Sequence, residues 1–248
     1  MRLNKYLSDA GVCSRREADR LILEGRIQVD GKTAELGMQA EEGQQIMVDG
    51  KAIVPDDKKV LLIFHKPRGI ECTANPRVKK NVISYIDYPI RIYYIGRLDK
   101  ESEGLLLLTN QGDLVNKMMR AGNCHEKEYL VTVDKPVTKD FIRKMSGGVP
   151  ILDTITRKCL VEQTGEKTFR IVLTQGLNRQ IRRMCSYLGY EVKRLKRIRV
   201  MNFELGDLPV GQYREATQDE MKVLQELIRD SSETTVTGKR DWRNSRHG

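Results

Sequence analysis

Hydrophobic positions in residues 1–53 follow first a helical and then a strand-like pattern. Two segments carry apolar residues three or four positions apart, as helices with one buried face do: Leu3–Ala10 and Ala18–Ile22. Ser14 and Glu17 have the spacing of a capping box before the second segment. Short alternating runs then lead to Asp-Gly pairs at 30–31 and 49–50, which favour tight hairpins. These residues are therefore predicted to form a small α+β domain.

A polar stretch at residues 54–59 separates this domain from residues 60–230, where strand patterns dominate. The four leucines at 105–108 are too few to span a membrane and indicate a strand buried on both faces. Residues 127–133 alternate as a half-buried strand does. Because helical segments are interspersed without regular βαβ alternation, we predict an α+β fold with a mixed, largely antiparallel sheet. Residues 231–248 contain little that could be buried and are predicted to be a disordered basic tail.

The net charge of +10 changes the picture because most of it lies in one short segment. Between residues 178 and 199 only Glu191 opposes eight basic side chains, which are Arg179, Arg182, Arg183, Lys193, Arg194, Lys196, Arg197 and Arg199. A solvated basic face is one interpretation. We favour a surface that follows a phosphate backbone, so nucleic acid is the expected partner.

The cysteines and histidines argue against several kinds of site. The five cysteines are scattered without CxxC spacing, which disfavours a disulfide framework and a zinc site. The three histidines are far apart, so we expect no metal-ligand cluster. No apolar run is long enough to span a bilayer and no signal-peptide pattern is present. We therefore expect a cytoplasmic protein without a membrane segment.

The candidate chemistry centres on Asp99, which lies in the turn Gly96–Lys100 directly before the buried leucines. A carboxylate at the boundary between core and surface loses hydration, and a neighbouring guanidinium would compensate by keeping it charged. On local chemistry alone, a surface ion pair is the more common explanation for such a residue. The wider sequence context changes that balance.

Three N-terminal segments resemble the S4 RNA-binding domain: Met1–Leu7, Ser14–Ala18 and Gly25–Gly31. The resemblance covers the whole predicted domain at residues 1–53. It implies that the two helices dock on structured RNA through its shape and its phosphates. The basic side chains that we expect to take part are Lys5, Arg15 and Arg16. An S4 domain by itself implies no catalysis.

Three further segments resemble motifs of the small-subunit/large-subunit rRNA pseudouridine synthase family: Gly96–Asp99, Lys127–Val131 and Gly176–Met184. They follow the S4-like domain in this order, and residues 195–200 and 205–211 fit the same family. The chain is therefore identified as a member of this family from Met1 to about Arg229, most similar to its F branch. The resemblance implies that residues 60–230 form a pseudouridine synthase catalytic domain.

The resemblance also implies roles for individual residues. Asp99 would be the catalytic aspartate, which either attacks the target nucleotide or removes a ribose proton, and both routes remain open. Arg182 would pair with this carboxylate and keep it ionised. Tyr129 would stack on the flipped uracil, and Arg97 would occupy the place that the base leaves. The basic residues expected to hold RNA phosphates are Arg179, Arg183, Arg197 and Arg199.

The implied reaction is the isomerisation of uridine to pseudouridine. It needs neither a redox agent nor a metal, so we expect no cofactor. The implied substrate is 23S rRNA near the peptidyl-transferase centre, with a tyrosine tRNA anticodon as a second candidate, and we expect a monomer. The alternative is a non-catalytic S4-type RNA-binding factor in ribosome assembly. The joint presence of Asp99, Tyr129 and Arg182 favours the enzyme.

Overall fold

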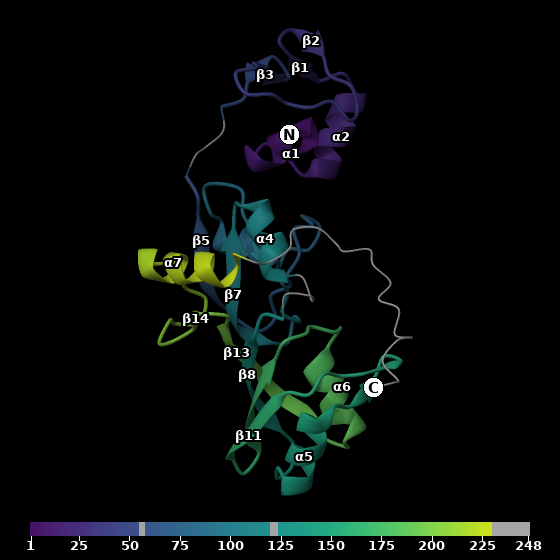
Figure 1. Cartoon of the computed structure of the whole chain (residues 1–248), viewed down its shortest axis with the longest axis vertical. Coiled ribbons are helices and arrows are strands. Elements are labelled where there is room, and N and C mark those ends of the chain that lie inside the picture. The colour runs from purple at the N-terminus through teal and green to yellow at the C-terminus, as the bar shows by residue number, and fades with distance from the viewer. Residues whose placement is uncertain (55–57, 120–123, 230–248) are drawn as a thin grey trace, which may run out of the picture.

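The computed structural model describes residues 1–54, 58–119 and 124–229. The predicted tail at 231–248 and the centre of the predicted linker lie outside the described residues. The chain consists of a small N-terminal part and a larger part built around one long sheet (Figure 1). Within the described ranges, no helix is both long and apolar enough to cross a membrane.

Two short helices and a four-stranded antiparallel sheet form the N-terminal part. The elements are α1 (Leu3–Asp9), α2 (Arg15–Leu23), β1 (Ile27–Val29), β2 (Lys32–Thr33), β3 (Ile46–Val48) and β4 (Lys51–Ala52). The strand order is β2-β1-β3-β4, and both Asp-Gly turns close hairpins because Asp30 and Asp49 take positive φ angles. Ser14 caps α2 as predicted, whereas the Glu17 carboxylate pairs with Arg20 instead of completing the capping box.

A nine-stranded sheet organises the larger part. Its strands are β5 (Leu61–Lys66), β6 (Tyr93–Ile95), β7 (Glu103–Thr109), β8 (Lys127–Val133), β11 (Leu160–Gly165), β12 (Thr168–Leu173), β13 (Val192–Val200), β14 (Phe203–Glu204) and β15 (Tyr213–Glu215). The main path is β11-β12-β8-β13-β7-β5-β15, with β6 paired to β7 and β14 to β13. Of the strand pairs described in this sheet, β13 with β7 is parallel and the others are antiparallel. The predicted α+β fold with a mixed, largely antiparallel sheet is confirmed.

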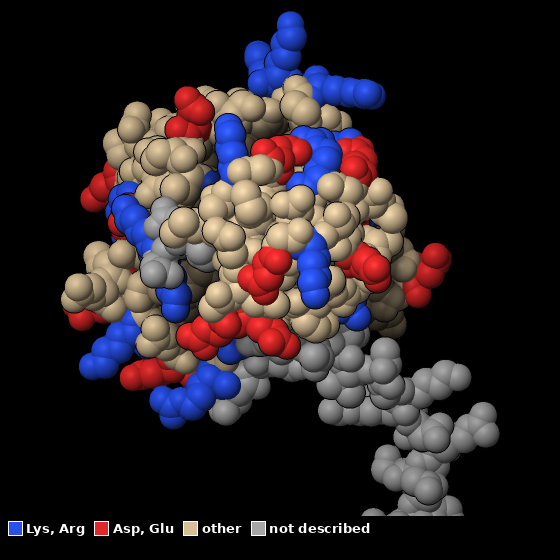
Figure 2. Space-filling model, turned by 90° about the horizontal axis from the view of Figure 1, so that it is seen from above, with Lys and Arg blue, Asp and Glu red and all other residues tan. Residues whose placement is uncertain are grey.

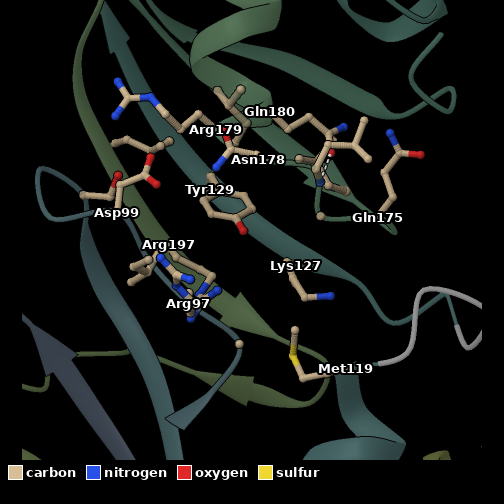
Figure 3. Close-up of a pocket in the computed structure, with 18 residues that line it drawn as sticks. Arg97, Asp99, Met119, Lys127, Tyr129, Gln175, Asn178, Arg179, Gln180 and Arg197 are labelled. Carbon is tan, nitrogen blue, oxygen red and sulfur yellow. Dashed lines mark hydrogen bonds between the residues drawn. The ribbon is translucent and has the colours of Figure 1, made fainter. Parts of the chain in front are cut away.

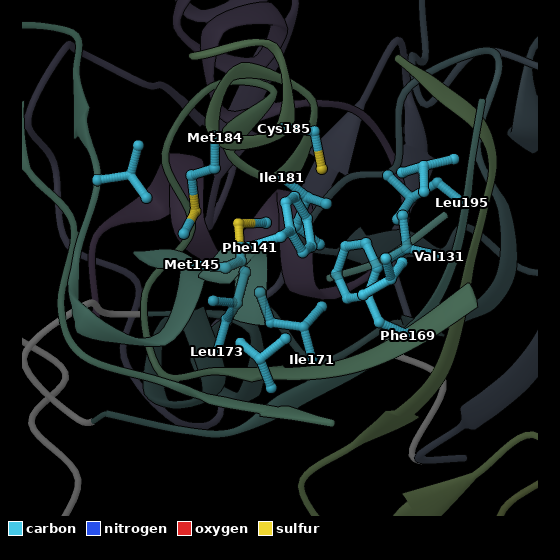
Figure 4. Packing of buried hydrophobic residues seen from close by; sticks show 14 of the residues in the cluster. Val131, Phe141, Met145, Phe169, Ile171, Leu173, Ile181, Met184, Cys185 and Leu195 are labelled. Atoms are coloured by element: carbon cyan, nitrogen blue, oxygen red, sulfur yellow. The ribbon is translucent and has the colours of Figure 1, made fainter. Parts of the chain in front are cut away.

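Helices pack on both ends of this sheet and create separate hydrophobic clusters. The remaining elements are α3 (Val82–Ile86), α4 (Gly112–Met119), α5 (Lys139–Gly147), α6 (Gln180–Tyr187), α7 (Gln218–Leu227) and the hairpin of β9 (Pro150–Ile151) and β10 (Thr154–Ile155). At one end α5 and α6 pack on β8, β12 and β13 through residues such as Phe141 and Met184 (Figure 4). At the other end α4 and α7 pack on β5 and β7 through Met118 and Leu224. The strands β7, β13 and β8 lie side by side where the two clusters meet.

The strand β7 lies inside the sheet, and all its residues are buried, as the leucine run predicted. Gly104 in this strand has a φ of +108°, and a Cβ atom there would lie 2.7 Å from the backbone nitrogen of Arg197 and closer still to its carbonyl oxygen. Only glycine allows β13 to approach β7 this closely. The close approach fixes the position of Arg197 relative to β7.

The N-terminal part contacts the larger part through side chains of α1. The hydroxyl groups of Ser8 and Tyr93 are 2.9 Å apart, and the Tyr93 hydroxyl also donates to the Ser8 carbonyl at 2.9 Å. The Lys5 ammonium lies 3.0 Å from the Asp113 carboxylate of α4. Tyr93 lies in β6, and β6 ends directly before the loop that begins at Gly96. The contact between the two parts is therefore made next to that loop in the sequence.

Candidate active site

A pocket of about 400 Å³ opens where β7, β13 and β8 lie side by side (Figure 3). Its size is in the range of small-molecule sites. Most of its lining comes from four segments that are far apart in sequence: loop 96–99, the start of β8, loop 175–179 with the start of α6, and the middle of β13. The residues singled out from the sequence that line it are Arg97, Asp99, Tyr129, Arg179 and Arg197. In the described parts of the chain, no group of three or more His, Cys, Asp or Glu residues could hold a metal ion.

Asp99 lies in a tight loop that its surroundings hold in place. Its carbonyl accepts a hydrogen bond from the Ser102 amide at 3.0 Å. The fully buried Lys66 ammonium donates to the carbonyls of Lys100 and Ser102 at 3.4 and 2.9 Å. Gly96 begins the loop with a φ of +71°, a conformation that favours glycine. These contacts fix the backbone that presents the Asp99 carboxylate.

The predicted ion pair between Asp99 and Arg182 is present. Arg182 Nε lies 3.6 Å from Asp99 Oδ2, which is an ion-pair distance but too long for a hydrogen bond. The two Nη atoms donate at 3.3–3.4 Å to oxygens of Val192, Glu101 and Ser102, which fixes the guanidinium. Burial lowers the pKa of Arg182, and the Asp99 charge acts in the opposite direction. The carboxylate thus helps to keep this arginine charged, although its side chain is only 15% exposed.

Tyr129, Lys127 and Arg197 project from the same face of the sheet into the pocket. Lys127 and Tyr129 are two positions apart in β8 and therefore share a face. Arg197 of β13 is the direct cross-strand partner of Tyr129, so the two side chains are neighbours. In Figure 3 the Tyr129 ring lies between Asp99 on one side and Lys127 on the other.

Lys127 is a pocket residue that sequence reasoning did not single out. Its ammonium donates to the His125 carbonyl at 3.2 Å, and burial, assisted by the charge of Arg197, lowers the pKa of Lys127 to about 8. The sequence did contain a signal for it, because Lys127 lies two positions before Tyr129 in an alternating strand and must therefore share its face. Lys66 was also missed, since two of its three carbonyl partners, Lys100 and Ser102, come from residues more than 30 positions away.

Arg97 and Arg179 are exposed where the pocket opens. Neither forms an ion pair with another described residue. Arg183, one turn further along α6, is exposed and donates from Nε to the Asn178 carbonyl at 3.0 Å. It lines a neighbouring groove together with Tyr187 rather than the pocket itself. The exposed arginines at the start of α6 therefore extend from the pocket mouth to this groove.

The basic segment between residues 178 and 199 does not form one exposed surface, which corrects the expectation from charge counting. Four of its side chains form ion pairs, which are Arg182–Asp99, Lys193–Glu191, Arg194–Glu103 and Arg199 with Glu126 and Glu128. Arg197 is only 2% exposed. Arg199 and Arg197 are therefore not free surface cations. Charge counting missed most of these acids because they come from β7 and the region of β8.

The basic residues expected to bind RNA in the N-terminal part differ among themselves. Arg15 and Arg16 are exposed on α2, but the Lys5 ammonium is engaged with Asp113 across the contact between the two parts. Residues 1–53 contain eight Lys and Arg against nine Asp and Glu. Figure 2, which views the molecule from its N-terminal end, shows both signs interspersed on that face. RNA binding there would depend on individually placed residues rather than on net charge.

Comparisons with known proteins agree with this geometry. A family model described as RNA pseudouridylate synthase matches residues 60–187, and one described as S4 domain matches residues 1–46. The dual-specificity RNA pseudouridine synthase RluF of Escherichia coli (strain K12) is 53% identical over 234 residues, which cover 94% of this chain and 81% of RluF. The ribosomal large subunit pseudouridine synthase B of Bacillus subtilis (strain 168) is 38% identical over 235 residues, which cover 91% of this chain and 96% of that protein.

The fold is also similar to a solved structure. A crystal structure of a pseudouridylate synthase superposes with a TM-score of 0.66 at 25% sequence identity. The superposition covers 90% of this chain and 99% of the other. The chain therefore belongs to the RNA pseudouridylate synthase family and carries an S4 domain at its N-terminus.

Proposed function

We propose that this protein converts a uridine of 23S rRNA to pseudouridine and that Asp99 is the essential carboxylate. The observation that carries the proposal is the meeting of Asp99, Tyr129 and Arg182 in or beside one nucleoside-sized pocket, although they come from three distant segments. The names of the relatives support RNA as the substrate, since one is a large-subunit pseudouridine synthase and another has dual specificity. A tyrosine tRNA anticodon, which the sequence resemblance implied, is the second candidate substrate.

A uridine in folded RNA must leave its stack before it can reach Asp99. Tyr129 offers a ring to the extruded base inside the pocket. Arg97 is exposed at the mouth, where its side chain can fill the gap that the base leaves. Unstacking costs a few kcal/mol, and contacts between phosphates and exposed arginines such as Arg179 and Arg183 offset that cost.

Asp99 must be ionised whether it attacks the nucleotide or removes a ribose proton. Bound RNA excludes water from the pocket, and loss of water disfavours a carboxylate. Arg182 compensates because three oxygen acceptors hold its guanidinium 3.6 Å from the carboxylate. We expect this distance to shorten in the complex, as catalytic contacts commonly tighten when substrate binds.

The two parts of the chain have separate tasks in this proposal. Residues 1–53 dock structured RNA, and residues 60–230 carry out the reaction. Residues 54–59 link the two parts. The enzyme acts as a cytoplasmic monomer and needs no cofactor.

Asp99→Asn tests the proposal because it removes the charge and keeps the shape. We expect no pseudouridine from the variant, while its affinity for RNA stays close to that of the wild type. Asp207→Asn, at an exposed position outside the pocket, is the matched control and should be fully active. Pseudouridines would be mapped in 23S rRNA and tRNA from cells that lack the protein and receive each version. Turnover of Asp99→Asn within about tenfold of the wild type would rule out Asp99 as the essential carboxylate.

A further inference from the structure

Two cations of the pocket, Lys127 and Arg197, take no part in the steps proposed for Asp99, Tyr129, Arg182 and Arg97. Lys127 and Arg197 project from β8 and β13 beside Tyr129. Arg197 Nε donates to the Leu105 carbonyl at 2.7 Å, whereas its Nη2 is buried and has no hydrogen-bond partner among the described residues. The Lys127 ammonium contacts the His125 carbonyl at 3.2 Å. Neither cation forms an ion pair within the part of the chain that the structure describes.

Neighbouring cations that are largely removed from water, with no carboxylate of their own, are unfavourable in the free protein. The effect is visible at Lys127, where desolvation first and the Arg197 charge second lower the pKa to about 8. Asp99, the acidic residue of the pocket lining, is engaged by Arg182. A ligand that brings negative charge to Lys127 and Arg197 would pair the buried Nη2 and relieve this repulsion.

The depth of these cations indicates which part of a nucleotide they meet. A phosphodiester continues into the RNA chain on both sides and stays at the pocket mouth, where Arg97 and Arg179 are exposed. Arg197, at 2% exposure, lies beside the Tyr129 ring and is closed to a tetrahedral group attached at two points. A flat carbonyl oxygen on a base stacked against that ring can reach it.

We propose that Lys127 and Arg197 bind a carbonyl oxygen of the extruded uracil and stabilise the negative charge that develops there. The inference rests on the proposed function. When the C1′–N1 bond breaks, its electron pair leaves with the base, and the resulting anion shares its charge among N1 and the two carbonyl oxygens. C5 then bonds to C1′, C5 loses its proton and N1 gains one, so the base becomes neutral again. Donors fixed around such an oxygen act as an oxyanion hole does.

Variants of Lys127 separate this role from RNA binding. Lys127→Met keeps the length of the side chain without its charge, and Lys127→Arg keeps the charge. On an RNA stem-loop that the full-length wild type modifies, we expect Lys127→Met to lower the single-turnover rate by about 10²–10³. RNA affinity should change less than about threefold, and Lys127→Arg should recover most of the rate. Lys139→Met, at an exposed lysine of α5, is the control.

An unchanged rate in Lys127→Met, or equal losses of rate and affinity, would overturn the inference. Those outcomes differ from failure of the proposed function, in which the wild type itself forms no pseudouridine.

A contact to a phosphate is the rival explanation, and a modified substrate distinguishes it. The stem-loop would carry an uncharged methylphosphonate at the phosphate of the target uridine. If Lys127 held that phosphate, the methylphosphonate and Lys127→Met would remove the same contact, and their effects on rate would not add. If Lys127 holds the base, the two losses multiply. Multiplied losses support the inference, and non-additive losses contradict it.

The free protein offers a test that does not depend on RNA. Lys127 is charged below a pH of about 8 in the folded chain and below 10.5 in the unfolded one, so the cost of burying its charge is fully present below pH 8 and fades as pH rises towards 10.5. Lys127→Met should therefore raise the Tm at pH 7 and lose this gain near pH 10. A lysine with a purely structural role would lower the Tm instead.

The activity should show the same titration. In the wild type, kcat/KM should fall as pH rises through about 8, because Lys127 loses its proton, and Lys127→Arg should remove this fall. A wild-type fall that persists in Lys127→Arg would assign the titration to another group. Among the described residues, the charged or titratable groups that line the pocket with Lys127 are Arg97, Asp99, Tyr129, Arg179 and Arg197, and His125 supplies the carbonyl that its ammonium contacts.

Discussion

At the scale of single residues, Arg182 supplies both a charge near Asp99 and a fixed fork of donors. Arg182→Ala removes both, so the carboxylate loses its compensating charge when water leaves the pocket. We expect single-turnover pseudouridine formation to fall more than about 100-fold and RNA affinity to change only a few-fold. Arg182→Lys, which keeps a charge but not the fork, should recover part of the rate.

Arg183→Ala is the matched control for this prediction. Arg183 is the next residue of α6 but is exposed and outside the pocket, so its loss should weaken RNA binding and leave the chemical step intact. Similar rate losses in Arg182→Ala and Arg183→Ala would contradict a special role for the pair with Asp99.

At this scale, the sequence predicted those residues best whose type and motif point to the same role. The pairing of Asp99 with Arg182 was predicted from the resemblance and is present. The depth of Arg197 and Lys127 was not predictable, because it depends on β13 lying between β7 and β8, and no local pattern encodes that order. Charge counting likewise could not show that Arg199 is paired with two glutamates.

At the scale of elements, the close approach of β13 to β7 depends on Gly104. A Cβ atom at Gly104 would collide with the backbone of Arg197, and the φ of +108° is strained for any other residue. We expect Gly104→Ala to lower the free energy of unfolding by at least about 2 kcal/mol. Gly147→Ala is the control, since a Cβ there meets nothing within 4 Å and alanine favours the helix α5.

Denaturant unfolding measures both variants. Equal stability of Gly104→Ala and Gly147→Ala would mean that β7 and β13 can separate at little cost.

Most helices and strands could be predicted from the sequence, whereas the pairing between strands could not. The leucine run predicted the buried strand β7, and both Asp-Gly pairs close the hairpins they indicated. These signals are local, because burial on both faces and positive φ angles select residue types directly. The neighbours of β7 are β5, β6 and β13, and the last lies about 90 residues further along the chain. Such long-range partners are chosen by global packing, which a local pattern does not contain.

At the scale of the whole molecule, the N-terminal domain is expected to select RNA through a few placed cations. Arg15 and Arg16 are exposed on α2, and the domain as a whole is not basic. The double variant Arg15→Ala/Arg16→Ala should weaken binding to folded 23S rRNA at least about tenfold and affect a short stem-loop much less. The slope of log affinity against log salt concentration should become shallower by about one to two, because about one to two fewer counterions are released on binding.

The matched control is Arg143→Ala/Lys144→Ala on α5, which also removes two exposed charges but lies at the far end of the molecule (Figure 1). Equal weakening on both RNAs, or the same effect in the control, would show that α2 is not the docking surface.

The hydroxyl contact between Ser8 and Tyr93 has a consequence for how one uridine is chosen among many. It joins α1 to β6, and only six positions separate Tyr93 from Asp99. When an RNA stem is bound to the first domain, the contact therefore fixes the distance between that stem and the Asp99 carboxylate. The enzyme would then select its uridine by the distance from the stem and not by the sequence of the neighbouring nucleotides. One base pair added to the stem would therefore bring a different nucleotide to the carboxylate.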